Sequence, residues 1–298
     1  MKIIHPSAKI IEQKELYQHI AYCAGICYNS LKKRNLSESL DFVTKLCDKG
    51  HISICRHGTR YFRCKKDLIP DEIKFSPYCE CELGPDKYAY ISINDQFYVE
   101  HDCFYNCEPI NEDEVKKIGT YNIIRRTILL ETSIGISREL NRVSPNNILE
   151  QSTRYVFEDG TICQPYWFRI FDIDYEYTYE HPFHYFKIEN EQYTEGRNLD
   201  YLTIDGYTRP MVESYLLNTE LQFNNYKQLI GYGMSKQDAR GLLPLDTATK
   251  CIYTYTLKEW KNIIDKRVHG TTGKPHPNAV VIMGIVEDLL SEELKYVI

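Results

Sequence analysis

The sequence predicts an α+β protein, in which long helices flank a mixed β-sheet. Helical periodicity dominates the last third of the chain, where amphipathic patterns cover residues 210–232, 257–267 and 278–294. The alternating segment Lys250–Thr256 precedes the second of these helices, and residues 52–64 also alternate in a strand-like way. Long helices on a modest sheet are typical of the α+β class.

Further helices are expected in the first half of the chain. Apolar residues recur at helical spacing in Glu12–Tyr28 and Leu40–Cys47, and Gly50 is expected to end the second of these helices. Another helix is predicted from Glu112 to about Thr132, and a shorter one from Gly135 to Arg142.

Two stretches look like insertions into a single domain that spans residues 1–298. The first, residues 65–107, is rich in turn signals and contains a predicted hairpin around Asn94-Asp95. The second, residues 157–205, is irregular and rich in tyrosine, which suits half-buried strands.

The composition indicates a protein of the cytosol. The formal charge of −6 does not favour a broad binding surface for nucleic acid. No apolar stretch is long enough to cross a membrane, and the first residues lack the core of a signal peptide. Eleven cysteines in such a chain are expected to be reduced thiols, so we expect a cytoplasmic protein with no membrane partner.

One group of cysteines raises the question of a metal site. Cys79, Cys81, His101, Cys103 and Cys107 are close enough in sequence to supply zinc ligands. Their spacings, CxC and then HxCxxxC, do not match a common zinc pattern, and no CxxC occurs in the chain. Packed thiols are the default expectation, and a structural zinc is the lesser alternative.

The stretch that is richest in functional signals begins at Ser137 and reads SRELNRVSPNNILEQSTRY. Arg142 follows another arginine by one helical turn. After a Pro-Asn-Asn turn signal, Glu150, Ser152 and Arg154 alternate, so a strand would point all three to one side. Guanidinium groups and hydroxyls beside a turn suit a phosphate-bearing ligand, and an exposed ion-pair network is the alternative.

Three further segments carry polar residues that surface exposure does not readily explain. They are GHISICRH from Gly50, DARGLLP around Arg240, and TYTLKEWKNIIDKR, which ends at Arg267. In their order along the chain, the four segments resemble the motifs of the flavin-dependent thymidylate synthases. The family's Arg-His-Arg signature, followed after seven residues by Ser, reads Arg142-Val143-Ser144 and then Ser152 here.

The resemblance implies an activity, a set of cofactors and an assembly. The activity is FAD-dependent reductive methylation of dUMP to dTMP, with methylenetetrahydrofolate and NADPH as co-substrates. The assembly is a homotetramer whose active sites are shared between subunits. The alternatives are flavin-assisted C5 modification of another pyrimidine nucleotide, and a nucleotide-binding homologue without turnover.

The resemblance also assigns site residues by their positions in the motifs. The residues matched to dUMP binding are Glu139, Arg142, Glu150, Gln151, Ser152, Thr153, Arg154, Arg240 and Arg267. The residues matched to flavin binding are His51, Ser53, Arg142, Val143, Ser144, Glu150, Thr256, Lys258 and Asn262. Arg267 is the catalytic candidate, because a fixed cation beside uracil would stabilise the negative charge that develops on the ring.

The match to the family's motifs is uneven. The phosphate-holding positions Ser152, Arg154 and Arg240 all carry the residues that the motifs require. Val143-Ser144, by contrast, stands where the family has His-Arg, so the departures concentrate on the flavin side.

Overall fold

The structure, a computed structural model, describes most of the chain. The described residues are 1–142, 147–170, 175–176, 185–187, 192–194, 202–204 and 207–298. The predicted α+β class is confirmed, because separate helices cover sheets that are largely antiparallel. Within these residues, none of the helices combines the length and the hydropathy that crossing a membrane requires.

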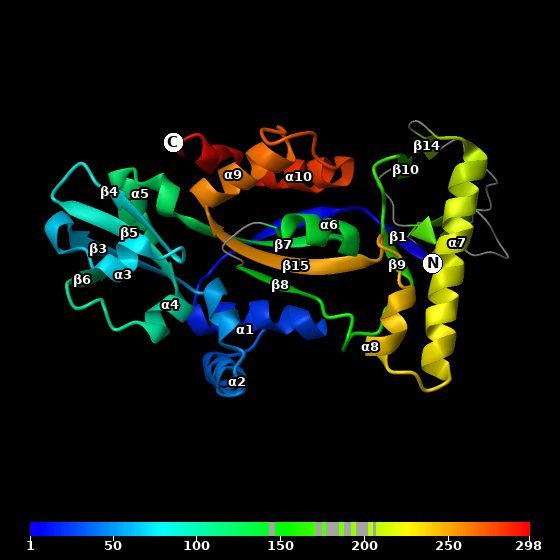
Figure 1. The fold of residues 1–298 in the computed structure, drawn as a ribbon, viewed down its shortest axis with the longest axis horizontal. Helices are drawn as coiled ribbons and strands as arrows, with labels where there is room; N and C mark the ends of the chain where they lie inside the picture. Colours follow the sequence, from blue (N-terminus) through cyan, green and yellow to red (C-terminus); the bar gives the residue numbers. More distant parts are fainter. Residues whose placement is uncertain (143–146, 171–174, 177–184, 188–191, 195–201, 205–206) are drawn as a thin grey trace.

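A four-stranded antiparallel sheet lies at the centre of the molecule (Figure 1). Its strand order is β2 (Ser7–Ile11), β7 (Arg125–Ser133), β15 (Ala248–Thr256) and β8 (Ile148–Glu150). β7 and β15 pair along their whole lengths and form the interior of the sheet. β15 confirms the strand predicted from the alternation of Lys250–Thr256.

Three helices pack against one face of this sheet. They are α6 (Ile134–Leu140), α9 (Leu257–Arg267) and α10 (Pro277–Leu294), and each confirms a helix predicted from the sequence. Figure 1 shows α9 and α10 side by side above the sheet. The apolar side chains buried in this layer include Ile128, Leu130, Tyr253, Tyr255, Trp260, Ile263, Ile282 and Met283. Removing these side chains from water is the main contribution of this layer to folding.

The opposite face of the sheet is covered by the first helices of the chain. α1 (Leu16–Gly25) runs into the 3₁₀ turn η1 (Ile26–Tyr28), and α2 (Leu36–Asp48) packs on the outside of α1. Both helices are confirmed, with starts that differ from those predicted. The side chains buried between α1, η1 and the sheet include Cys23, Ile26, Leu129 and Ile252.

Buried polar side chains also cross this face and tie η2 (Ile52–His57) to the sheet. The His57 Nδ1 atom lies 2.8 Å from the Thr254 hydroxyl, which lies 2.8 Å from the Thr127 hydroxyl. His19 Nε2 is 3.0 Å from the same Thr127 oxygen. Burial lowers the pKa of His57 and lowers that of His19 to about 4, so both imidazoles are neutral at pH 7.

A second antiparallel sheet lies at one end of the molecule (Figure 1). Its strand order is β4 (Cys79–Leu83), β5 (Tyr88–Asn94), β3 (Thr59–Lys65) and β6 (Cys107–Ile110). The short helices around it are η3 (Lys66–Leu68), α3 (Asp71–Phe75), α4 (Asp95–Glu100), α5 (Glu112–Ile118) and η4 (Tyr121–Ile123). The predicted insertion at residues 65–107 therefore supplies most of this sheet.

The long helix α7 (Arg209–Gly231) lies at the other end, beside the N-terminus (Figure 1), and confirms the helix predicted over residues 210–232. It is followed by α8 (Lys236–Ala239) and the 3₁₀ turn η6 (Arg240–Leu242). The short strands of this end are β1 (Lys2–Ile4), β9 (Thr161–Cys163), β10 (Phe168–Ile170), β11 (Tyr175–Glu176), β12 (Tyr185–Lys187), β13 (Gln192–Thr194) and β14 (Leu202–Ile204). β1 pairs in parallel with β9 and antiparallel with β11.

The helix predicted from Glu112 to Thr132 is wrong beyond Ile118. Gly119 ends α5 in the left-handed conformation, with φ of 85°, and the following apolar run forms β7. This strand is buried on both faces, between α10 and α1, and so its sequence does not alternate. A short continuous apolar run cannot be assigned to strand or helix by periodicity alone.

Two other local predictions are also wrong. Asn94 does not form a hairpin turn with Asp95, because its side chain accepts a hydrogen bond from the Phe97 amide at 2.8 Å and begins α4. The strand predicted over residues 52–64 begins only at Thr59, since the first half of that segment forms η2.

The thiols of the candidate metal cluster lie in and around the core of the second sheet. Cys103 is buried in this core, and Cys79, Cys81 and Cys107 pack against it. His101 stacks on the Phe97 ring, with the centroids 4.1 Å apart. No group of three or more His, Cys, Asp or Glu side chains among the described residues is arranged to hold a metal ion.

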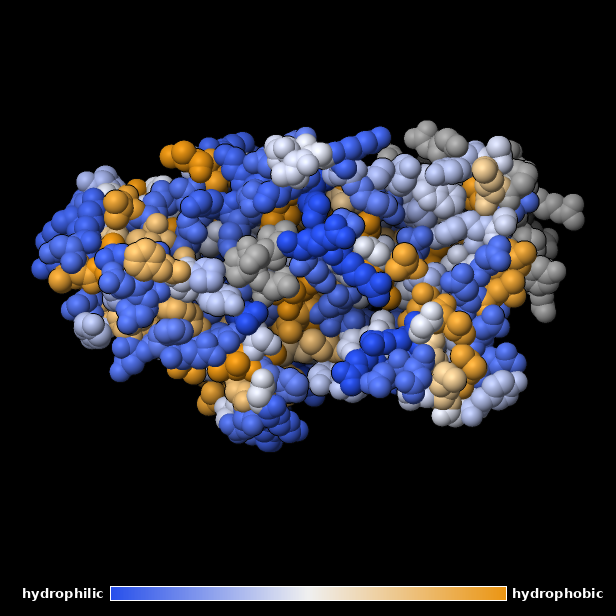
Figure 2. Space-filling model, viewed as in Figure 1, coloured by the Kyte–Doolittle hydropathy of each residue, from blue (hydrophilic) through white to orange (hydrophobic). Residues whose placement is uncertain are grey.

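Figure 2 shows that hydrophilic side chains predominate on the face viewed in Figure 1. Apolar side chains gather in separate places, over the second sheet at one end and over α7 and α8 at the other. The exposed apolar side chains in and after α7 and α8 include Leu221, Tyr232, Met234, Leu242 and Leu245. Exposed apolar groups that are gathered on one side of a protein often mark a contact surface.

Candidate functional site

Glu150, the last residue of β8, is held by hydroxyl groups from two neighbouring elements. Its Oε1 atom accepts a hydrogen bond from the Ser137 hydroxyl of α6 at 2.7 Å and from the Thr249 hydroxyl of β15 at 3.4 Å. Burial raises the pKa of the Glu150 carboxyl, and hydrogen bonds from Ser137, Asn141 and Thr249 partly oppose this effect. The carboxylate is therefore fixed in orientation at the junction of β8 and α6.

The residues after Glu150 form a turn, and the predicted strand with Glu150, Ser152 and Arg154 on one side is wrong. The amides of Tyr155 and Val156 donate to the Ser152 carbonyl at 3.1 and 2.9 Å, which closes one helical turn. The Ser152 amide donates to the Cys27 carbonyl at 3.1 Å and anchors this turn to η1. The Gln151 amide still donates to the Lys250 carbonyl of β15 at 2.9 Å, and the chain leaves the sheet for the local turn after this residue.

This turn lies against α8, which begins at the N-cap residue Ser235. Arg154 Nε donates to the Gln237 side chain at 2.9 Å, and Arg240 Nη1 donates to the Thr153 hydroxyl at 3.4 Å. The fold thus brings together two segments that are some 80 residues apart in the sequence, and both belong to the predicted phosphate site.

Lys236 completes a basic cluster, which we define as Arg154, Lys236 and Arg240. The Lys236 ammonium group donates to the Tyr155 carbonyl at 2.9 Å. Arg154 and Arg240 are exposed, and within the described part of the chain none of the three side chains forms an ion pair with a carboxylate. Three cations without counter-charges are suited to bind an anion such as a phosphate group.

Arg267, the catalytic candidate, lies at the end of α9 and reaches the end of α6. Its Nη2 atom donates to the Glu139 carbonyl at 2.8 Å, and its Nη1 atom lies 4.0 Å from the Glu139 carboxylate. The Arg267 Nε group is buried and has no hydrogen-bond partner among the described residues. Arg142 also approaches Glu139, at 3.9 Å, but its side chain is 72% exposed.

The residues predicted to bind flavin are not gathered in one place. His51 and Ser53 are exposed at the start of η2, and Asn262 is exposed on α9. The Thr256 hydroxyl is occupied in the capping box of α9, where it accepts from the Glu259 amide at 3.2 Å, and the Lys258 ammonium group pairs with Glu80. The predicted positions Val143 and Ser144 lie outside the described residues.

The sequence matches one known protein family. The family is described as "Thymidylate synthase complementing protein", and its match covers residues 119–275, which is more than half of the chain. The chain belongs to this family. The resemblance inferred from the motifs is thereby confirmed, and the matched range runs from the end of α5 to beyond α9.

The solved structures with a distant likeness to this chain include two of one protein. Two structures of the UMP/dUMP methylase PolB from Streptomyces cacaoi, with 5-Br dUMP and with 5-Br UMP, align with TM-scores of 0.47. Their identities are 12% and 13%, and each alignment covers 99% of this chain and 94% or 92% of the other. No curated protein matches the sequence of this family member.

The match with the thymidylate synthase complementing proteins includes the basic cluster, Glu150 and Arg267, but not His51 and Ser53. The basic cluster and the Arg267–Glu139 pair are held by separate sets of contacts. No hydrogen bond or ion pair between described residues links the basic cluster directly to Arg267 and Glu139. The described residues therefore bring together the basic cluster, and separately Arg267 with Glu139, but they do not join these two parts of the predicted site.

Several residues that hold the predicted site were not identified from the sequence. They are Ser137, Asn141, Lys236, Gln237 and Thr249. Two of them could have been found from helical spacing, because Lys236 precedes Arg240 by four residues and Asn141 follows Ser137 by four. Thr249 and Gln237 give no such local signal, since their contacts depend on the tertiary fold.

Gln151 faces a different part of the molecule from the basic cluster. It lines a cleft of about 510 Å³, where its side-chain amide donates to the Glu158 carboxyl at 3.3 Å. Burial raises the pKa of Glu158 from its ordinary 4.5 to about 7, with the Gln151 hydrogen bond opposing this shift and the Asp159 charge adding to it. Near neutral pH, Glu158 is therefore close to half protonated.

The Glu158→Gln variant should be more stable than the native chain in alkaline solution. The raised pKa means that the folded state holds this proton up to about pH 7, whereas the unfolded state releases it near pH 4.5. Between these values the native chain loses stability as the pH rises, by about 3 kcal/mol in total, and a glutamine avoids this loss. Urea unfolding at pH 5 and pH 8 measures the difference.

The neighbouring Asp159→Asn variant is the control, because it removes one negative charge from an exposed position beside the same cleft. Its stability relative to the native chain should rise only slightly between pH 5 and pH 8, because the Asp159 charge is a smaller cause of the Glu158 pKa shift than burial is. An equal gain for both variants would show that the net charge of the region, and not burial of Glu158, sets the pH dependence.

Proposed function

We propose that this protein methylates C5 of a uracil nucleotide, converting dUMP to dTMP. The observation that supports this most is the pairing of the Ser152–Tyr155 turn with α8, which gathers three cations beside a serine hydroxyl. Membership of the thymidylate synthase complementing proteins supports a nucleotide phosphate as the anion that this site binds.

The basic cluster is proposed to hold the nucleotide phosphate. Among the described residues, Arg154 and Arg240 each donate to one neutral side chain, Gln237 and Thr153, so most of their N–H donors are open to a ligand. A phosphate dianion would satisfy these donors and neutralise the cluster. Ser152 lies inside the same turn, where its Oγ atom accepts from the Arg154 amide at 3.3 Å.

Arg267 and Glu139 are proposed to face the uracil ring. Uracil C5 is a weak nucleophile, and it becomes stronger as negative charge develops along the N3–O4 edge of the ring. A guanidinium that is already oriented by the Glu139 carbonyl can stabilise that charge without further reorganisation. Glu139, Arg142 and Glu150 would then position the nucleoside, with Gln151 and Thr153 beside them.

FAD is proposed as the redox cofactor, with methylenetetrahydrofolate as the carbon donor and NADPH as the reductant. Bound FAD would pass two electrons from NADPH to the transferred carbon unit. The exposed side chains of His51, Ser53 and Asn262 are free to contact such a group. Thr256 is committed to its helix cap and Lys258 to Glu80, so these two residues would contact a flavin only after rearrangement.

The complete site is proposed to form between subunits of a cytoplasmic homotetramer. Among the described residues, no hydrogen bond or ion pair joins the basic cluster to Arg267. Arg154 and Arg240 are exposed, and the Arg267 side chain is 21% exposed. Exposed apolar side chains adjoin the basic cluster, among them Tyr155, Met234, Leu242 and Leu245. A second copy that covers this surface would bury these side chains and could bring its own flavin-binding residues to the nucleotide.

The absorption spectrum of the purified protein tests this proposal. A yellow protein whose flavin spectrum changes on addition of dUMP, and which forms dTMP from dUMP with methylenetetrahydrofolate and NADPH, is the expected result. Product analysis with UMP in parallel decides between the two nucleotides. A protein that stays colourless after incubation with FAD, yet binds dUMP, would instead be a nucleotide-binding member of the family without turnover.

The Arg154→Ala variant should bind dUMP about 10- to 150-fold more weakly, corresponding to roughly 1.5–3 kcal/mol for a charge-assisted hydrogen bond. The reason is the loss of one guanidinium from the phosphate site. Isothermal titration with dUMP measures the affinity, and titration with deoxyuridine gives the contrast, because a nucleoside without phosphate should bind both proteins alike.

Arg138→Ala is the matched control, since Arg138 is an exposed arginine on α6 outside the basic cluster. It should bind dUMP within a factor of about two of the native protein. Unchanged dUMP affinity in Arg154→Ala would remove the phosphate assignment.

A further inference from the structure

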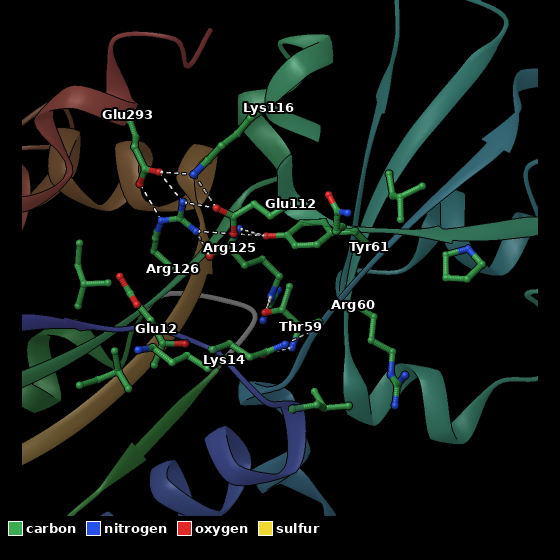
Figure 3. Close-up of a pocket in the computed structure, with 18 of the residues that line it drawn as sticks. Glu12, Lys14, Thr59, Arg60, Tyr61, Glu112, Lys116, Arg125, Arg126 and Glu293 are labelled. Atoms are coloured by element: carbon green, nitrogen blue, oxygen red, sulfur yellow. Dashed lines mark hydrogen bonds and ion pairs between the residues drawn. The ribbon is translucent and has the colours of Figure 1, made fainter. Parts of the chain in front are cut away.

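A cleft of about 790 Å³ opens between the central sheet and the second sheet (Figure 3). Its walls come from β2 and the residues after it, from β3 and β6 of the second sheet, and from α5, β7 and α10. None of the residues proposed to bind nucleotide or flavin lines this cleft. A ligand of this cleft would therefore be distinct from the nucleotide and the flavin of the proposed function.

Most of the charges in the cleft neutralise one another. Arg126 pairs with Glu112 at 2.7 Å and also with Glu293, and Lys116 pairs with Glu112 at 2.8 Å and with Glu293 at 3.6 Å. Figure 3 shows these four side chains gathered at one end of the cleft. Two cations and two carboxylates form a closed network there, which leaves no charge for a ligand.

Arg60 is also committed elsewhere, although its residue contributes to the wall. Its Nε atom pairs with Asp95 at 2.6 Å, and its guanidinium lies over the Tyr98 ring at 4.1 Å. In Figure 3 the Arg60 side chain points away from the other labelled residues.

Arg125 is different, because it is a buried cation without a carboxylate partner among the described residues. It is 6% exposed, and its guanidinium donates to the Thr59 hydroxyl at 3.3 Å and to the carbonyls of Arg56 and Thr254 at 3.1 and 3.4 Å. These bonds use Nε and Nη2, and Nη1 makes none to any residue that the structure describes. Burial lowers the pKa of Arg125, and the Glu259 charge opposes this shift.

A buried guanidinium that touches no carboxylate is unfavourable, and the Glu259 charge offsets this only in part, so an anion that reaches it would be stabilising. The cleft gives such access, since Arg125 and the Thr59 hydroxyl both line it, and the exposed Lys14 stands at its wall. The remaining wall combines polar side chains, such as Glu12, Gln13 and Asn111, with apolar ones. The apolar side chains include Ile10, Phe62, Pro109, Ile110 and Leu289.

We propose that this cleft binds a small organic carboxylate with an apolar body, whose carboxylate is held by Arg125 Nη1 and Lys14. Arg125 is the buried cation of this pair, so a monoanion is favoured over a phosphate dianion, whose second charge would have only the exposed Lys14 as a partner. The apolar side chains of the wall favour a ligand with a hydrocarbon or aromatic body. The volume is ample for a molecule of that kind.

Binding of 2-naphthoate to the full-length protein tests this proposal, with the neutral 2-naphthamide and inorganic phosphate as contrasts. Isothermal titration should show that 2-naphthoate binds at least about tenfold more tightly than the amide, because only the acid carries the charge that Arg125 lacks. Equal affinity for the acid and the amide, tighter binding of phosphate, or no binding of 2-naphthoate would each overturn the proposal.

Three variants localise the binding without removing a buried residue. Lys14→Gln should weaken 2-naphthoate binding by about two- to fivefold, and its counterpart Glu12→Gln, at the same wall, should strengthen it by a similar factor. Leu289→Trp, at a position that is 40% exposed, should block the cleft and abolish binding. Native affinity in both Lys14→Gln and Leu289→Trp would place the ligand elsewhere and overturn the assignment.

The Arg125→Met variant is the direct test of the guanidinium. It should lose 2-naphthoate binding while keeping dUMP binding, because Arg125 does not adjoin the basic cluster. A native protein that binds 2-naphthoate but does not bind dUMP would contradict the proposed function alone. The two proposals can therefore fail separately.

Discussion

Replacement of Trp260 by alanine is expected to lower the free energy of unfolding by about 4 kcal/mol, within the range for a large aromatic residue in a well-packed core. Trp260 is 1% exposed and packs edge-on against Tyr255, with ring centroids 5.4 Å apart and planes at 87°. Its indole N–H also donates to the Arg126 carbonyl at 3.0 Å. The substitution therefore removes the main contact between α9 and the central sheet and leaves a cavity that a helix anchored at both ends cannot close.

Urea denaturation followed by circular dichroism measures this change. Trp260→Phe keeps most of the buried surface and should lose about 1–2 kcal/mol, which includes the unsatisfied Arg126 carbonyl. Tyr232→Ala is the surface control, because Tyr232 is 77% exposed, and it should stay within about 0.5 kcal/mol of the native protein. A loss below 1 kcal/mol in Trp260→Ala would mean that α9 does not pack on the sheet as described.

The elements that could be predicted from the sequence are those whose signals are local. α9 begins and ends at the predicted residues, because Thr256 and Glu259 form a capping box before an amphipathic run. The predicted starts of α10 and α7 are right to within one residue for a similar reason, since proline marks the first turn of each. In each case the decisive residues lie within one helical turn of the boundary.

The elements that could not be predicted are those that depend on distant partners. β7 reads as a continuous apolar run, and only its position between α1 and α10 makes it a strand. The turn after Glu150 has the alternation of a strand, but the chain leaves β15 after Gln151, whose amide donates to the Lys250 carbonyl. Local sequence does not show where a neighbouring strand stops, so the alternation was misleading.

The candidate site also contains features that local sequence predicts and features that depend on distant parts of the chain. The motifs placed Arg154 and Arg240 in one function, and the fold brings them together through Gln237 and Thr153. Lys236 joins them because α8 presents residues four apart on one side. Among the described residues, no hydrogen bond or ion pair joins this cluster to Arg267, and no local pattern in the sequence predicted this separation.

The Arg267→Gln variant is expected to lower kcat for methylation of dUMP by about 10²- to 10³-fold, the loss seen when one preorganised donor to a developing charge is removed. KM for dUMP should change only a few-fold, because the proposed phosphate site is the basic cluster and does not include Arg267. Glutamine retains a side-chain amide that can donate to the Glu139 carbonyl, so the junction of α9 and α6 should persist. Steady-state kinetics, together with dUMP titration of the same samples, separates the effect on turnover from the effect on binding.

Lys266→Gln is the matched control, because it removes a positive charge from the adjacent position of the same helix, where no site residue is predicted. It should retain kcat within about twofold, since a solvent-facing charge contributes little at that distance. Arg267→Lys should fall between the two, because an ammonium group keeps the charge but loses the planar fork that the Glu139 carbonyl orients. Native turnover in Arg267→Gln would show that the charge developing on the uracil ring is stabilised by another group, and the proposed orientation of the base against α6 and α9 would then be wrong.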